Sequence, residues 1–297
     1  NYLQRGTDKV PDVVQVASHS LNPQPGLREV SAFPKDLRAS HGFDNQADQL
    51  TLSPLLLDAF LRLSVSIVES PDFTEQNVGI WNDYFKAPPE GTELSAEVRK
   101  RLARFLRMAF RGPVDKETLD RYVQYAVATM KQGLPFTESM KKVTSAVLSS
   151  PHFLYRSVAA DATEREFELA SNLSYFLWGS CPDSELLELA GKGELSKQEV
   201  LRKTVARMLA DPKVERFLDT FPSQWMQLEN LLAVTPDPQI NKYFSLDKRN
   251  PASLQMVLEP LLLFDTVFVE DRPIVELIAP KFSYQSRFLQ DWYQTPL

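Results

Sequence analysis

The sequence predicts an all-α protein, and two observations carry that prediction. Apolar residues recur at helical spacing over most of residues 51–297, and serine or aspartate marks the start of several of these segments. No segment shows sustained alternation of apolar and polar residues between hairpin turns, which half-buried strands require. We therefore expect about eight to ten helices in an array of antiparallel helical hairpins.

The N-terminal 50 residues are expected to form an irregular arm. They carry four prolines and no sustained apolar period, a pattern typical of extended chain with at most a turn of helix. The prolines are Pro11, Pro23, Pro25 and Pro34.

A first helical module is expected over residues 51–160. Ser53-Pro54 places a capping side chain directly before a proline at the first helical position. Gly112-Pro113 stops another apolar run. The expected helices run from Ser53 to Val68, Ser95 to Arg111, Asp115 to Met130, and Phe136 to Leu148.

A second helical module is expected over residues 161–297, after a boundary at Ala159–Ala162. Thr163 with Glu166, and Ser196 with Glu199, fit the capping box that marks a helix start. Asp211-Pro212 marks a third start. Pro222 and Pro260 lie inside apolar stripes, where proline removes a backbone hydrogen bond, so we expect kinks at both. Trp178 and Trp225 lie on apolar stripes and are expected to be core anchors.

Composition excludes several functional classes. The 297 residues include 33 basic and 39 acidic side chains, a net charge of −6, which does not favour a nucleic-acid partner. Neither glycine-rich phosphate motif occurs, and the single Cys181 leaves no C-x-x-C or covalent haem motif. Apolar runs such as Leu261–Phe264 are too short to span a membrane. No signal-like segment follows Asn1, so the chain is expected to be processed or cut from a longer protein.

Several motifs together resemble the helical domains of unknown function in large planctomycete-type cytochrome-c-linked proteins. The resemblance covers roughly residues 30–290, and the motifs follow the order of that family. They are His41-Gly42-Phe43-Asp44-Asn45, Phe105-Leu106-Arg107 with Ala109-Phe110-Arg111, Ser150 to Arg156, Leu173 to Trp178 with Pro182-Asp183, Arg207 to Pro212, and Phe221 with Gln224-Trp225.

The resemblance implies an exported protein, periplasmic or at the cell surface, whose partners are other modules of the same larger protein, a cytochrome c domain among them. It supplies no agreed catalytic residue. This chain lacks the haem motif, so the resemblance implies no cofactor within it.

One polar cluster is a candidate site for chemistry. His41 lies beside Asp44, Asn45 and Asp48. A histidine beside a carboxylate can act as a general base, so His41 and Asp44 are candidate catalytic residues. The oxygens of Asp44, Asn45 and Asp48 are candidate calcium ligands, although the calcium-loop pattern with its terminal glutamate is absent. We favour the alternative that these side chains shape a hydrogen-bonded turn and cap the following helix.

Two further residues have a chemical and a structural interpretation. His152 is a candidate catalytic residue or metal ligand, but a helix-end histidine packed among aromatics is the favoured alternative. Cys181 is interpreted as a small buried hydrophobe, because no partner for a catalytic thiol is indicated.

The helix over Ser95–Arg111 is strongly basic. At 100° per residue its cations form one stripe opposite the apolar stripe, and such a stripe is a candidate site for an anionic polymer or surface. A solvated face balanced by nearby acids is favoured. The residues of the stripe are Lys100, Arg104, Arg107 and Arg111.

Three functions therefore stay open. The leading hypothesis is a non-catalytic or scaffold part of an exported cytochrome-linked assembly, which positions redox or substrate-binding modules. The second is a fragment of a metal- or haem-assisted oxidoreductase or of a degradative enzyme. The third is a binding module for an anionic polymer.

Overall fold

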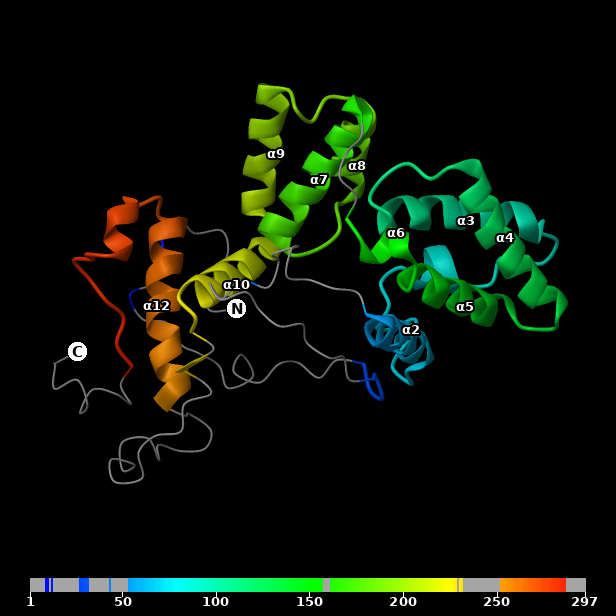
Figure 1. Ribbon diagram of the computed structural model, residues 1–297, viewed down its shortest axis with the longest axis horizontal. Coiled ribbons are helices and arrows are strands. Elements are labelled where there is room, and N and C mark those ends of the chain that lie inside the picture. Colours follow the sequence, from blue (N-terminus) through cyan, green and yellow to red (C-terminus); the bar gives the residue numbers. More distant parts are fainter. Residues whose placement is uncertain are drawn as a thin grey trace. The chain divides into compact units, whose positions relative to one another are not determined.

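The computed structural model describes residues 9–10, 12, 27–31, 43, 53–156, 161–228, 230–231 and 252–286. Within these residues every regular element is a helix, so the predicted all-α class is confirmed (Figure 1). None of the described helices is long and apolar enough to cross a membrane.

The chain forms two compact units. The larger unit contains residues 25–35 and 51–207, and the smaller contains residues 1–24, 36–50 and 208–297. These units divide the chain at other positions than the arm and two modules expected from the sequence, so the boundary expected near residue 160 stays a prediction.

The first half of the larger unit packs four long helices. They are α2 (Pro54–Glu69), α3 (Leu94–Ala109), α4 (Lys116–Lys131) and α5 (Phe136–Leu148), with the π-helix η1 (Trp81–Phe85) and the short α6 (Pro151–Leu154). Helix α3 packs against α4, and α5 packs against both α2 and α4. The six residues between α3 and α4 make these two a helical hairpin, as predicted.

A core of buried apolar side chains holds these helices together. Its fully buried members include Phe85, Val98, Leu102, Leu106 and Met140. The four α3 and α5 members come from the apolar stripes of those helices, which face each other across the core.

The second half of the larger unit consists of α7 (Ala162–Trp178), α8 (Ser184–Gly191) and most of α9 (Gln198–Ala210). Helix α7 packs against α8, and Gly179 ends α7 in the left-handed conformation that glycine adopts without strain. Trp178 is fully buried, which confirms its prediction as a core anchor.

Two of the caps predicted from the sequence are confirmed. The Ser53 hydroxyl accepts from the Leu56 amide at 3.2 Å, and Asp115 accepts from Thr118 at 2.7 Å. Two other helix starts are wrong by a few residues. Glu93 rather than Ser95 caps α3, because its carboxylate reaches two amides.

The capping box predicted at Thr163 is also wrong. Asp161 caps α7 by accepting from the Glu164 amide at 2.8 Å. The Glu166 carboxylate is buried and accepts instead from the Ser196 amide, at 3.2 and 3.3 Å. Glu166 therefore connects α7 to the segment that leads into α9.

The smaller unit is built on α10 (Glu215–Trp225) and α12 (Ala252–Val269), preceded by the 3-10 turn η2 (Pro212–Val214) and followed by η4 (Ile274–Leu277). The two helices pack together through tilted aromatic rings. These rings are Phe217, Phe221, Phe264 and Phe268, with Trp225 beside Phe221. Pro222 and Pro260 lie inside these helices, as the sequence places them.

Trp225 is not the core anchor that its apolar stripe predicted. Its side chain is 46% exposed, although its ring lies 6.0 Å from that of Phe221. The same stripe is buried again at Leu228, which packs with Val257 and Leu261 of α12, so the exposure is local to Trp225.

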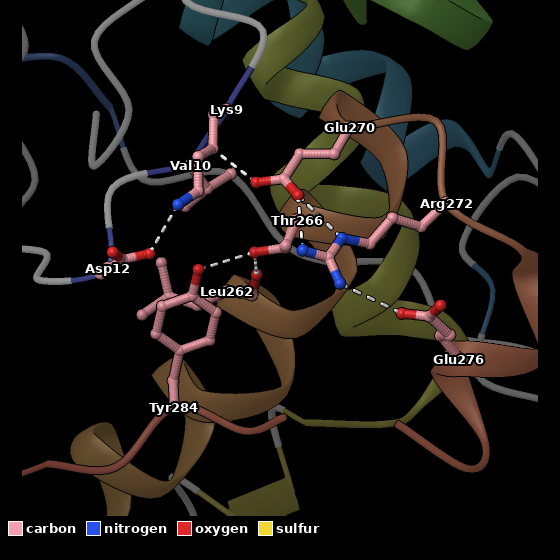
Figure 2. A network of polar contacts seen from close by, with 9 residues as sticks. All are labelled: Lys9, Val10, Asp12, Leu262, Thr266, Glu270, Arg272, Glu276 and Tyr284. Carbon is pink, nitrogen blue, oxygen red and sulfur yellow. Dashed lines mark hydrogen bonds and ion pairs between the residues drawn. The ribbon is translucent and has the colours of Figure 1, made fainter. Parts of the chain in front are cut away.

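A polar network fixes the end of α12 to a segment from the far N-terminus (Figure 2). The Val10 amide donates to the Glu270 carboxylate at 3.0 Å, and Val10 is fully buried. The Tyr284 and Thr266 hydroxyls lie 2.8 Å apart. Residues separated by 260 positions are therefore neighbours in this unit.

The two tryptophans offer a matched test of these assignments. We expect Trp178→Ala to lower the free energy of unfolding by about 3–5 kcal/mol, because it leaves a large cavity in a closed core. Trp225→Ala should cost clearly less, since nearly half of that side chain already contacts water. Urea denaturation followed by circular dichroism measures both, and equal losses would contradict the burial described above.

Candidate functional site

Arg111 forms the most unusual polar site among the described residues. Its guanidinium is buried and donates to four backbone carbonyls, at 2.5 to 3.2 Å. The acceptors belong to Ala109, His152, Phe153 and Tyr155. Within the described chain no carboxylate bonds to this guanidinium, so its charge is balanced by carbonyl dipoles.

The position of these carbonyls explains how a buried cation is tolerated. Ala109 is the last residue of α3, and the other three acceptors lie in or directly after α6. The carbonyls at the end of a helix lack an intrahelical partner and carry partial negative charge. Arg111 therefore supplies a donor to acceptors at two helix ends that have none within their own helix.

The backbone of Arg111 adopts a conformation that usually favours glycine. Its φ is +60°, in the left-handed region. The Arg111 amide donates to Met108 O and the Gly112 amide to Arg107 O, which is the Schellman arrangement at the end of α3. Glycine would occupy this position without strain, so the side chain of Arg111 is what the site requires.

A second arginine joins the same region to α7. The Arg156 guanidinium donates to the Asn172 side-chain oxygen and lies 5.1 Å from the centre of the Tyr175 ring. The contact is a cation–π pair on the surface of α7. The two motif segments, Ser150–Arg156 and Leu173–Trp178, are therefore brought together.

Tyr175 also contacts the single cysteine. Its hydroxyl lies 3.3 Å from the Cys181 sulfur, and Cys181 is partly exposed rather than fully buried. The prediction of a small buried hydrophobe is therefore wrong for Cys181, because the turn after α7 brings it back to a polar hydroxyl. Burial first, and then the hydrogen bond with Cys181, raise the pKa of Tyr175 to about 12.

A third contact joins α3 to α8. The Arg107 guanidinium donates to the Leu187 carbonyl at 2.9 Å. Beside it the Phe167 ring packs on Gly112, where an added Cβ would meet the ring at 3.8 Å. That distance is an ordinary van der Waals contact, so the ring does not by itself require glycine at this position.

A separate cluster of polar residues lies around Trp178. Arg207 donates to Asp183 at 2.7 Å, pairs with Glu185 at 3.2 Å, and lies 5.5 Å from the Trp178 ring centre. Asp183 also caps α8 by accepting from Leu186. This cluster joins α7, α8 and α9.

The predicted catalytic and calcium candidates at His41, Asp44, Asn45 and Asp48 lie outside the described residues, so they stay predictions. Their neighbour Phe43 is described, and its ring lies 6.0 Å from that of Phe221. This contact brings two of the motif segments together in the smaller unit.

His152 lies at the exposed surface of α6. Its ring packs 5.2 Å from the Phe110 ring, and its carbonyl accepts from Arg111. Its proximity to His41 is not described, because His41 is outside the described residues. No group of three histidine, cysteine, aspartate or glutamate side chains among the described residues is placed to hold a metal ion.

The four cations of the predicted basic stripe differ in exposure and in hydrogen-bond partners. Lys100 and Arg104 are exposed on α3, Arg107 is exposed but donates to Leu187, and Arg111 is buried. The four cations therefore do not form one free surface, and anion binding by the exposed pair stays a prediction.

The sequence analysis did not predict that the Arg111 side chain joins the ends of α3 and α6. The available signal was an arginine directly before Gly112-Pro113, at the position after a helix end where glycine is the usual residue. The four acceptors are up to 44 positions away, so the sequence does not reveal them.

Variants of Arg111 separate the side chain from the backbone. Arg111→Ala should lower the free energy of unfolding by about 1–3 kcal/mol, because buried carbonyls lose a charged donor. Arg111→Gly should cost less than alanine, since it relieves roughly 1–2 kcal/mol of left-handed strain. The control Arg62→Ala removes an exposed ion pair with Asp58 and should cost no more than about 1 kcal/mol. A glycine variant more stable than the parent would contradict a stabilising role of the Arg111 side chain.

The ionisation of Tyr175 can be followed by phenolate absorbance, with Tyr175→Phe to identify its signal. We expect it to ionise near pH 12, and Cys181→Ala to lower that pKa only in part, because burial is the larger cause. A raised pKa means that the folded protein holds this proton more tightly than the unfolded chain. The resulting stabilisation is complete below about pH 10 and is lost as the pH rises toward 12. Ionisation of Tyr175 at an ordinary pKa would contradict the burial of its hydroxyl and the contact of that hydroxyl with Cys181.

Comparison with known domain families gives three matches along the chain. Residues 21–70 match PSD3, a protein of unknown function (DUF1587), residues 97–157 match PSD5, a protein of unknown function (DUF1595), and residues 165–295 match PSD4, a protein of unknown function (DUF1592). Neither the comparison with curated proteins nor the comparison with solved structures finds a match. Three consecutive segments of this chain are thus similar to domain families of unknown function.

Proposed function

We propose that this chain is a non-catalytic helical scaffold within an exported, cytochrome-linked multidomain protein. In this role it holds redox or substrate-binding modules of the same protein at fixed positions. The observation that supports the proposal most directly is the use of motif arginines to join helices from different segments.

The acceptors of these arginines support an orienting role. Arg107 and Arg111 donate to backbone carbonyls, and Arg156 donates to an amide oxygen while lying over an aromatic ring. Guanidinium groups have five donors in a fixed planar arrangement, so several such bonds restrict rotation between the helices that they join. A scaffold needs this restriction.

Two carboxylates of the larger unit support the same role. Asp183 caps α8 and accepts from Arg207, and Glu166 accepts from the amide of Ser196. Each carboxylate is occupied by a contact within the fold. Both carboxylates therefore supply contacts that set the positions of helices.

The cytochrome-linked and exported parts of the proposal come from the resemblance of the motif set. They are tested by isolating the full gene product from its natural host and measuring covalently bound haem in the exported fraction. Full-length product that is exported and carries haem supports them, and product retained in the cytoplasm without haem contradicts them.

The scaffold role is tested by measuring how rigidly the helices are held. Spin labels at Glu117→Cys on α4 and Lys203→Cys on α9, in a Cys181→Ser background, report the distance between two exposed positions of the larger unit. We expect one narrow distance distribution in the parent and a broader one in the Arg107→Ala/Arg156→Ala variant, with helix content unchanged. Arg62→Ala, whose ion pair lies within α2, serves as the matched control. A broad distribution in the parent, or no effect of the double substitution, would contradict the scaffold.

A further inference from the structure

Residues 27–31 form a short segment that is bound to the end of α2 and to the loop after it. We call this segment the strap. The Arg28 amide donates to the Asp72 carboxylate at 3.0 Å, and the Arg28 carbonyl accepts from the Ser70 hydroxyl at 2.7 Å. The Leu27 side chain packs against the buried core of the larger unit. The strap is therefore held by backbone hydrogen bonds and by apolar contact.

The remaining contacts of the strap are exposed to solvent. The Arg28 guanidinium donates to both carboxylate oxygens of Asp72 at 2.8 to 3.1 Å, while 69% and 26% of the two side chains are exposed. The Ser31 amide donates to the Ser66 hydroxyl at 2.9 Å. Between these contacts Glu29 has a φ of +60°, which is unfavourable for any residue but glycine. Few buried contacts and a strained backbone favour local opening without unfolding of the helices.

The chain on both sides of the strap is anchored in the smaller unit. Upstream, Val10 is buried in that unit and its amide donates to the Glu270 carboxylate (Figure 2). Downstream, the Phe43 ring lies 6.0 Å from the Phe221 ring of α10. The strap itself belongs to the larger unit. The chain therefore leaves the smaller unit before the strap and returns to it afterwards.

The strap determines how many chain connections are held between the units. Connections run between the two units after residues 24, 35, 50 and 207. If the strap leaves its site, the first two are no longer fixed to the larger unit, and the connections after residues 50 and 207 remain. A connection held at both ends limits separation, because the chain extends by at most about 3.3–3.6 Å per residue.

We propose that the strap is a releasable tether that restricts the movement of the smaller unit relative to the larger unit. With the strap closed, each connection beside it keeps its two ends at a high effective concentration of each other. Opening of the strap removes two such restraints, so the range of separations available to the units widens. The strap acts between the units, whereas the arginine contacts of the scaffold lie within the larger unit, so each role can be tested without the other.

The first test measures strap opening in the whole chain by hydrogen exchange of the Arg28 and Ser31 amides, followed by NMR. We expect both amides to be protected in the parent. Asp72→Ala removes the acceptor of the Arg28 amide and guanidinium, so both amides should exchange about tenfold faster or more, with core amides of α5 unchanged. The matched control is Arg62→Ala, which removes an exposed ion pair with Asp58 and should leave both amides protected. Unprotected amides in the parent, or equal exchange in Asp72→Ala, would overturn the proposal.

The second test measures the freedom of the units relative to each other. Spin labels are placed at the exposed positions Glu117→Cys on α4 and Thr220→Cys on α10, in a Cys181→Ser background. We expect a broader distance distribution in the Arg28→Ala/Asp72→Ala variant than in the parent, because two of the four held connections are lost. A distribution that is unchanged by this double substitution would show that the strap is not a tether.

A second label pair separates release of the strap from loosening of the larger unit. Glu117→Cys with Lys203→Cys lies within that unit, so its distribution should stay as narrow as in the parent when the strap opens. Arg62→Ala should leave both label pairs unchanged. Broadening of both pairs by the strap variant would overturn the tether. Failure of the scaffold would instead appear as a broad distribution of the Lys203 pair in the parent, so the two failures are distinguishable.

Discussion

The larger unit depends on one buried positive charge. The Arg111 guanidinium lies among the carbonyls at the ends of α3 and α6, which have no helical donor of their own. Removing a charged group from water is costly unless several partners surround it, and here four carbonyls do so. The chain accepts a left-handed backbone at this residue because only a side chain there reaches both helix ends.

The contacts around Arg111 extend this constraint to the neighbouring helices. Arg156 connects α6 to Asn172 and Tyr175 of α7, and Arg107 connects α3 to α8. Arg207 then joins α8 and α9 over the Trp178 ring. The motif segments that resemble separate domains are thus joined by side chains whose acceptors are set by tertiary packing, a pattern that suits a structure whose role is to orient other parts.

The smaller unit uses a different means of cohesion. Tilted contacts among the rings of Phe217, Phe221, Phe264 and Phe268 join α10 to α12, and the polar network around Glu270 holds a distant N-terminal segment. Aromatic pairs supply much apolar contact with few side chains, while the network determines where the chain turns after α12. The aliphatic residues Ile274 and Val275 of η4 lie outside this packing and are exposed.

The sequence by itself determined the helical class and the helix starts at Ser53 and Asp115. Ser53 and Asp115 reach amides three residues ahead, so the pattern that predicts the cap contains both partners. Tertiary structure decided the rest. Glu166 bonds to an amide 30 positions away, and Arg111 bonds to carbonyls more than 40 positions away. Burial of Trp178 but not of Trp225 depends on what covers each apolar stripe. Hydrogen bonds within one turn are encoded by spacing, whereas long-range partners and coverage exist only after the helices have packed.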